Sequence, residues 1–253
     1  MRRRLAVALV LWAAAAQAQA VVADLPTPLG AERAAFLPAR GARATVVVLL
    51  AGGSGIVAIG PGGETANQNF LIRTRAMWAA YGIDALILGS PGNASLLGRR
   101  ATPAYAQALG VAVDFARSRA NVPVWLVGTS QGSIAAVNGA AHLGAKVAGA
   151  VLSSSVTRNS RSGETVASAE PAAIAVPVLV VANSGDTCPA TPPGDAQGLL
   201  ASMPASPRKE VILFESSAIR SAPCDALSPH GYMGIEASVI QRIAAWIAAG
   251  PGR

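Results

Sequence analysis

Short runs of apolar and often β-branched residues recur along the chain. Such runs are typical of strands that are buried on both faces of a parallel sheet. A weaker pattern at 33–37 predicts a further strand at one edge of the sheet. The six clear runs are 46–50, 83–88, 124–127, 147–153, 178–182 and 211–214.

Between these runs, apolar residues recur at three- and four-residue spacing, which is the pattern of helices that pack on a sheet. Because strands and helices alternate, we expect right-handed crossovers between parallel strands. The sequence therefore predicts an α/β fold, with a mostly parallel sheet covered by helices on both faces. The predicted helices are 67–81, 102–119, 131–142, 194–202 and 234–249.

The least regular stretch is 155–172, which is polar and contains Arg158, Arg161 and Glu164. Two interpretations stay open for it: a rim or small lid over a site, or a solvent-exposed loop without a role. Some twenty residues can form a flap but not a large cap domain, so no large cap is expected.

The first twenty residues have the pattern of a secretory signal peptide. Three arginines at 2–4 precede an apolar run at 5–16, and A-Q-A at 18–20 resembles a cleavage site. The run is too short to span a bilayer, and no later stretch is long enough without glycine, proline or charge. We therefore expect residues 1–20 to be removed and 21–253 to form a single exported domain, periplasmic or secreted, with no membrane span.

Charge and composition narrow the functional classes. The formal net charge is +7, and three of these charges belong to the predicted signal peptide. The other arginines are scattered and Lys146 and Lys209 are the only lysines, whereas nucleic-acid binding requires clustered basic residues. Two histidines and two cysteines give no cluster of metal ligands, so neither nucleic acid nor a metal or other cofactor is expected.

Residues 128–132 read G-T-S-Q-G and match the pattern G-x-S-x-G. They lie between a predicted strand and a predicted helix, which is the context that a nucleophile elbow requires. The turn is so tight that only glycine fits at its two flanks. Ser130 is therefore the candidate nucleophile, displayed at the carboxyl edge of the sheet.

A serine hydroxyl is a poor nucleophile at neutral pH and needs an adjacent base. The chain has two histidines. His142 lies three turns along the helix that follows Ser130, roughly 18 Å away at 1.5 Å per residue, and cannot reach it. His230 lies in an irregular stretch between the last predicted strand and the last helix, so it is the candidate base.

The base must be held in one tautomer by an acid, which this type of site places between the serine and the histidine in chain order. Asp186 follows the predicted strand 178–182 in a turn at the same sheet edge as Ser130. Asp195, which opens a predicted helix, and Asp225, beside Cys224, are the competing candidates. We select Asp186 as the candidate acid.

The two cysteines, Cys188 and Cys224, are expected to form a disulfide, because an exported chain reaches an oxidising compartment. Cys188 is two residues beyond the candidate acid, and Cys224 is six residues before the candidate base. The bridge would tie these two loops together. A purely structural role for the disulfide remains the alternative.

Acyl transfer also requires donors for the oxyanion. One is the amide of Gln131, which follows the nucleophile, and the other is expected from Gly53 or Ser54 in the glycine-rich loop after the strand 46–50. Gly53 and Gly55 also match a dinucleotide-binding pattern. That pattern requires a helix to open at this point, but G-P-G-G follows at 60–63, so we reject it.

These motifs, in this order, resemble those of the α/β-hydrolase superfamily over about 46–249. The histidine that many of its esterases and lipases carry before the oxyanion glycines is replaced by Ala51. The resemblance implies a serine hydrolase that cleaves a small-molecule ester or related acyl bond through an acyl-enzyme. A peptidase or acyltransferase would use the same residues, and a non-catalytic binding protein with this fold is the alternative from another class. Substrate identity, acyl-chain length and oligomeric state do not follow from the sequence.

Overall fold

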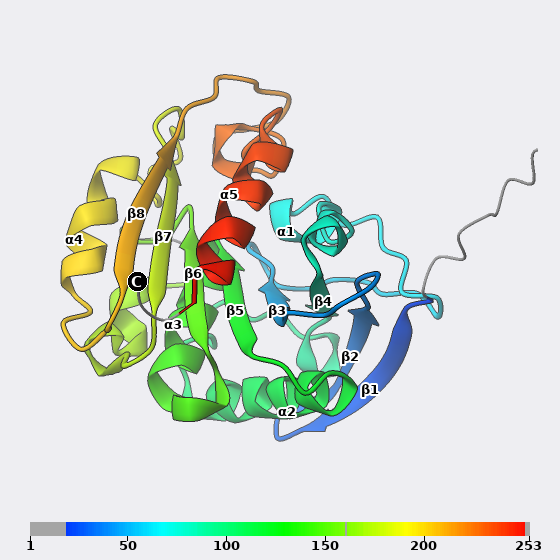
Figure 1. Cartoon of the computed structure of the whole chain (residues 1–253). Coiled ribbons are helices and arrows are strands. Elements are labelled where there is room, and N and C mark those ends of the chain that lie inside the picture. Colours follow the sequence, from blue (N-terminus) through cyan, green and yellow to red (C-terminus); the bar gives the residue numbers. More distant parts are fainter. Residues whose placement is uncertain (1–18, 160, 251–253) are drawn as a thin grey trace, which may run out of the picture.

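The structure, a computed structural model, describes residues 19–159 and 161–250 of the chain (Figure 1). Most of the predicted signal peptide, at 1–18, lies outside the described residues. Within them, eight strands form one sheet in the spatial order β1-β2-β4-β3-β5-β6-β7-β8. The strands are β1 (Val21–Thr27), β2 (Gly30–Leu37), β3 (Thr45–Leu50), β4 (Ile83–Leu88), β5 (Val124–Thr129), β6 (Gly149–Ser153), β7 (Val178–Asn183) and β8 (Lys209–Phe214).

The predicted α/β fold with a mostly parallel sheet is confirmed. Strands β3 to β8 pair in parallel, and only β2 runs antiparallel to its neighbours β1 and β4. Each of the six predicted strands is present, and the weaker pattern at 33–37 belongs to β2. The strand predicted at 211–214 is not buried as expected, because β8 lies at the edge of the sheet and its residues are exposed or half-buried. The predicted strand 147–153 begins later, at Gly149, because a 3₁₀ turn over Gly144–Lys146 precedes it.

Strand β1 is not among the predicted elements. It contains Asp24 and Pro26, and only Leu25 is buried, so its pattern of apolar residues is weak. Proline is tolerated at a sheet edge, where its missing N–H leaves no neighbouring strand unpaired. β1 forms a hairpin with β2, and Asp24 pairs with Arg33 across it at 2.8 Å.

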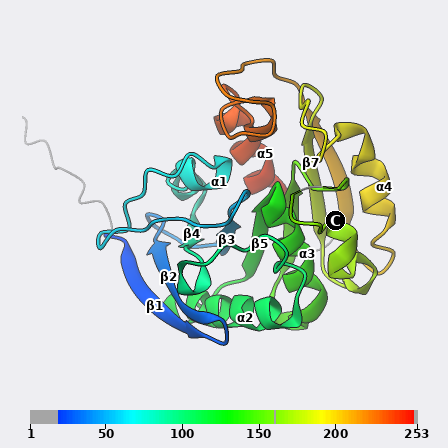
Figure 2. The ribbon, with the colours of Figure 1, turned by 180° about the vertical axis from the view of Figure 1, so that it is seen from behind.

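Helices cover both faces of the sheet (Figures 1 and 2). None of them is long and apolar enough to cross a membrane, a finding that covers the described residues alone. The predicted helix 194–202 is shorter than expected, because a 3₁₀ turn over Pro193–Asp195 precedes it. The helices are α1 (Phe70–Arg73), α2 (Pro103–Arg119), α3 (Gln131–His142), α4 (Ala196–Ala201) and α5 (Glu236–Ala248).

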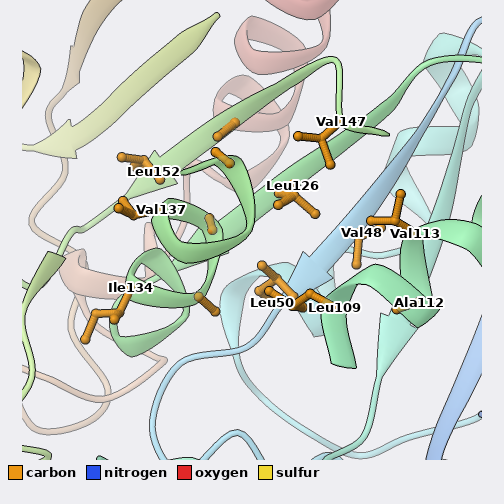
Figure 3. Packing of buried hydrophobic residues seen from close by; sticks show 14 of the residues in the cluster. Val48, Leu50, Leu109, Ala112, Val113, Leu126, Ile134, Val137, Val147 and Leu152 are labelled. Atoms are coloured by element: carbon orange, nitrogen blue, oxygen red, sulfur yellow. The ribbon is translucent and has the colours of Figure 1, made fainter. Parts of the chain in front are cut away.

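The core has two layers because successive residues of a strand point to opposite faces of the sheet. Val48, Leu50 and Leu126 face α2 and α3, where Leu109 and Val137 pack against them (Figure 3). The alternate strand residues pack on the other face against α1 and α5. The parallel strands between these layers are held rigidly, so the loops at their carboxyl ends start from fixed positions.

The prediction of one continuous helix over 67–81 is wrong. The structure has the single turn of α1, then a 3₁₀ helix over Met77–Tyr81. The side-chain oxygen of Asn67 accepts the N–H of Asn69, a local turn that delays the helix start. The hydroxyl of Thr74 donates to the carbonyl of Phe70 at 2.7 Å, at the point where α1 ends.

The stretch 155–172 is not a solvent loop, so that alternative is wrong for the residues described. Val156, Val166 and Ala169 are buried beside α3. The carboxylate of Glu164 accepts the backbone N–H groups of Arg100 and Ala101 at 3.3 and 3.0 Å. The segment is therefore held against the rest of the domain by its apolar side chains, which pack beside α3, and by the hydrogen bonds of Glu164.

Candidate functional site

Ser130 occupies a strained turn between β5 and α3, as the pattern G-x-S-x-G predicts. Its φ and ψ angles are 54° and −127°, a conformation that a residue with a side chain rarely adopts. A Cβ on Gly128 would lie 2.1 Å from the carbonyl oxygen of Gly132, and a Cβ on Gly132 would lie 2.0 Å from that of Leu50. Both glycines are thus required by close backbone contacts.

Backbone hydrogen bonds hold Ser130 in this conformation. Its N–H donates to the carbonyl of Ser153, at the end of the neighbouring strand β6, at 3.0 Å. Its carbonyl accepts the N–H and the hydroxyl of Ser133 at 2.9 and 2.7 Å. The elbow is therefore attached to both the sheet and the first turn of α3, and its position is fixed before any ligand binds.

Asp186 lies in the turn after β7, where its carboxylate is surrounded by donors. Oδ1 accepts the N–H of Cys188 at 2.9 Å, and Oδ2 accepts the hydroxyl of Thr191 at 2.9 Å. Nδ1 of His230 lies 2.9 Å from the same Oδ2, and the two side chains are 4% and 1% exposed. The predicted acid and base are thus in direct, buried contact.

The loop of His230 is held to the ends of β6 and β7. The hydroxyl of Ser154 donates to the carbonyl of His230 at 2.8 Å. The hydroxyl of Tyr232 donates to the carbonyl of Val181 at 3.0 Å and accepts the N–H of Ser154 at 3.2 Å. Tyr232 is fully buried, and this burial raises the pKa of its phenol, so the hydroxyl keeps its proton.

Cys188 and Cys224 form the predicted disulfide, with their Cα atoms 4.7 Å apart and 36 positions apart in the sequence. The bond joins the loop of Asp186 to the loop that leads into His230. Cys188 is 3% exposed, and its backbone N–H is one of the donors to Asp186. One half of the disulfide therefore belongs to a residue whose backbone is hydrogen-bonded to the acid.

The glycine-rich loop after β3 reaches the nucleophile. Gly52 and Gly55 close a turn, in which the N–H of Gly55 donates to the carbonyl of Gly52 at 3.1 Å. Gly53 has a positive φ of 57°, and Ser54 follows it at the tip of the turn. A Cβ on Gly52 would lie 2.9 Å from the Cβ of Ser130, so the loop and the elbow are in contact.

A cavity of about 220 Å³ opens at this point. Asp225, rejected above as the acid, is exposed at its rim. No described residue of 155–172 lines it, so nothing supports the prediction of a lid there. The lining residues are Gly52, Gly53, Ser54, Ile56, Asn67, Asn69, Phe70, Thr129, Ser130, Cys224, Asp225, Ala226, His230 and Gly231.

A larger cavity, of about 770 Å³, lies elsewhere, beside Ala20, Leu37 and Glu64. It contains none of the predicted site residues and adjoins the start of the described chain. The smaller cavity is therefore the candidate active site, because the candidate nucleophile, base and oxyanion loop all line it.

The other two rejected candidates, His142 and Asp195, are not among the residues that line this cavity. Nδ1 of His142, at the end of α3, lies 2.9 Å from the carbonyl oxygen of Asn138 one turn earlier. Asp195 is at the start of α4, as expected, but it also forms an ion pair with Arg158 and accepts the hydroxyl of Thr157 at 2.7 Å. The ion pair with Arg158 lowers the pKa of Asp195.

Three residues of the site were missed by the sequence reasoning: Thr191, Ser154 and Tyr232. Thr191 contacts both Asp186 and His230, with its Oγ1 3.0 Å from Nδ1 of the histidine. A threonine five residues beyond an aspartate carries no motif, so the sequence holds no signal for it. The sequence did carry a signal for Tyr232, because an aromatic residue two positions after the candidate base is unusual in a solvent-exposed loop.

Comparisons with known proteins agree with this architecture. A scan against protein-family models and a search of curated proteins each found no match. Among solved structures, an esterase described as cold-adapted, from an Arctic intertidal metagenomic library, is 15% identical with a TM-score of 0.62, covering 91% of this chain and 93% of that one.

Two further solved structures are similar to this chain over nearly their full length. A dienelactone hydrolase from Anabaena variabilis is 16% identical with a TM-score of 0.66, covering 94% of this chain and 100% of that one. A serine hydrolase without a lid from Xanthomonas campestris is 14% identical with a TM-score of 0.60, covering 93% and 97%. The sheet order and these likenesses show that the chain has the α/β-hydrolase fold, with no cap domain among its described residues.

Proposed function

We propose that this protein is an exported serine hydrolase that cleaves a carboxylic ester through an acyl-enzyme. Ser130 attacks the carbonyl carbon, His230 takes the hydroxyl proton and later delivers it to the leaving alcohol, and Asp186 orients His230. The amide of Gln131 and one from Gly53 or Ser54 donate to the oxyanion.

One observation carries this proposal: the buried contact between Asp186 and His230 is directed toward the cavity that Ser130 also lines. With Nδ1 occupied by the carboxylate, Nε2 is the nitrogen left to accept a proton from the nucleophile. A serine in a strained elbow that lines the same cavity as such a histidine is the arrangement from which acyl transfer can start.

The choice of an ester rests on the cavity and on the similar structures. Esters are easier to cleave than amides with these residues, and none of the described residues forms a cap over the cavity. The neighbouring structures named above include an esterase and a dienelactone hydrolase. A volume of about 220 Å³ favours a small acyl group over a long one.

Export is supported by two features. The pattern of residues 1–20 is that of a secretory signal peptide. The disulfide between Cys188 and Cys224 is the second feature, because such bonds form and persist in oxidising compartments.

The proposal is tested with a fluorophosphonate probe, which reacts with activated serines, followed by mass spectrometry of the labelled peptide. Wild-type protein should be labelled at Ser130, and both Ser130→Ala and His230→Ala should abolish the label. His142→Ala, which removes the other histidine, should label like wild type. A folded wild-type protein that resists the probe would instead support a binding protein with this fold.

A further inference from the structure

Asn69 lies directly beside the candidate nucleophile. The position that a Cβ on Gly52 would take is 2.9 Å from the Cβ of Ser130 and 3.3 Å from Nδ2 of Asn69. The side-chain amide and the serine therefore both border the space that this glycine leaves open. Asn69, Ser130 and His230 also line the same cavity.

The orientation of the amide is fixed by the chain around it. Oδ1 of Asn69 accepts the N–H of Leu71 at 3.2 Å, at the start of α1. Because a backbone N–H needs an acceptor, the oxygen must be the end that faces Leu71, and the NH₂ group must be the other. The N–H of Asn69 is held in turn by Oδ1 of Asn67 at 2.9 Å.

Nδ2 of Asn69 has no hydrogen-bond partner among the described residues, so both of its N–H groups are available to a ligand in the cavity. A helix cap needs only the oxygen of such a side chain. The nitrogen is thus not needed for the fold. Its place beside Ser130 points to a role in the reaction.

We propose that Asn69 donates a side-chain N–H to the oxyanion that forms when Ser130 attacks an ester, an inference that rests on the function proposed above. In that step the Oγ–C bond forms, the carbonyl π pair moves onto the oxygen, and His230 takes the hydroxyl proton. Asn69 transfers no proton; its hydrogen bond strengthens as the negative charge grows. The pair returns when the alkoxide leaves and takes the proton from His230.

This donor adds to the backbone amides of the oxyanion site. Removing one oxyanion donor lowers kcat by roughly 100- to 1000-fold in comparable sites. The proposed role of Asn69 also explains why position 52 is a glycine, because a methyl group there would fill the space that the amide and the nucleophile border.

The test compares Asn69→Ser, Asn69→Asp and Asn69→Ala with wild type, using a short-chain nitrophenyl ester. Serine and aspartate cap a helix about as well as asparagine but place no N–H donor here. We expect kcat to fall roughly 100-fold or more in all three, with KM changed only a few-fold. The melting temperatures of the serine and aspartate variants should stay near that of wild type. Gln68→Ala, next to Asn69 and exposed, is the control and should keep wild-type kcat.

A boronic acid that forms a tetrahedral adduct with the serine gives a second readout. Its affinity should fall in Asn69→Ser as far as kcat does, because the adduct carries the oxygen that Asn69 contacts. Full activity and unchanged boronate affinity in both Asn69→Ser and Asn69→Asp, with loss only in Asn69→Ala, would show a helix cap and overturn this role alone. A wild-type protein that does not react with the fluorophosphonate probe would overturn the proposed function, and the inference with it.

Discussion

Nδ1 of His230 lies 2.9 Å from Oδ2 of Asp186, and both side chains are almost completely buried. In such surroundings a hydrogen bond to an ionised group is stronger than in water, and it selects one tautomer of the imidazole. The positive charge that His230 gains when it accepts a proton is stabilised by the same contact.

Replacing Asp186 with asparagine keeps the size of the side chain but removes the charge and turns an acceptor into a possible donor. The imidazole would then favour the tautomer that leaves Nε2 protonated and unable to act as a base. We expect kcat for ester hydrolysis to fall by roughly 10³- to 10⁴-fold. Asp225→Asn, at the rim of the same cavity, should leave kcat within a few-fold of wild type. An Asp186→Asn protein that retained most of its kcat would remove Asp186 from the mechanism.

Thr191 should act as a positioning residue for Asp186. Thr191→Val keeps the shape of the side chain but removes the hydroxyl that donates to Oδ2 at 2.9 Å. A hydrogen bond to a charged group contributes about 1.5 to 3 kcal/mol, so kcat should fall roughly 10- to 100-fold. Thr191→Ser keeps the hydroxyl and should restore most of the activity, and equal losses in both variants would point to packing instead.

The disulfide should affect both stability and catalysis. Closing a loop of this length stabilises the folded state by about 3 to 4 kcal/mol in the chain-entropy model, and the Cys188→Ala/Cys224→Ala variant should lose stability of that order in urea unfolding. Because the N–H of Cys188 contacts Asp186, kcat should fall as well under conditions in which the variant is still folded. Unchanged kcat with reduced stability would mean that the bond is structural only.

The glycine at position 132 should be intolerant of even one methyl group. In Gly132→Ala the new carbon would meet the carbonyl oxygen of Leu50 at 2.0 Å, so β3 and α3 would have to move apart. We expect a loss of at least 2 kcal/mol in unfolding free energy and loss of labelling at Ser130. Gly198 lies on the exposed face of α4, and a Cβ placed there would have no neighbouring atom within 4 Å outside its own helix backbone. Gly198→Ala should therefore stabilise the protein by roughly 0.5 to 1 kcal/mol.

Glu32 makes stability depend on pH. It lies on β2 with both carboxylate oxygens buried and, within the described chain, without a hydrogen-bond partner, and this burial raises its pKa to about 7 from an ordinary value of 4.5. Between these two values the folded state holds a proton that the unfolded chain has released. The free energy of unfolding should therefore fall as pH rises from 4.5 to 7, and then level off.

The comparison with Glu32→Gln measures this effect, because the amide stays neutral at every pH. We expect urea unfolding at pH 5 and pH 8 to show that the free energy of unfolding falls by up to about 3 kcal/mol more in wild type than in the variant. Glu215→Gln, an exposed position, should retain the wild-type dependence. Identical pH profiles for wild type and Glu32→Gln would mean that the carboxylate is paired or hydrated in solution.

The sequence was sufficient to predict the fold and the positions of the main site candidates. Buried parallel strands such as 83–88 are continuous apolar runs, and a motif between a strand and a helix, as at Ser130, has its geometry set by the elements on either side. Asp186 could be selected because it follows a strand whose carboxyl end meets the same sheet edge.

What the sequence did not reveal depends on contacts between distant segments. Strand β1 is recognisable only through its pairing with β2, since all of its residues except Leu25 are exposed or half-buried. The helix predicted over 67–81 is interrupted where the side chains of Asn67 and Thr74 bond to the nearby backbone, and the apolar periodicity does not reveal such bonds. Thr191 contacts Asp186 and His230 only because the disulfide-linked loops meet there.

The contacts of Tyr232 fix the backbone next to His230 when the protein folds, before any substrate binds. Its hydroxyl bridges the carbonyl of Val181 and the N–H of Ser154, so the backbone next to His230 is part of the core and cannot swing freely. The conformational entropy lost in fixing the base is therefore lost once, during folding, and not again in each catalytic cycle. A substrate that enters the cavity meets a base that is already in place, and the entropy lost on binding is that of the substrate itself.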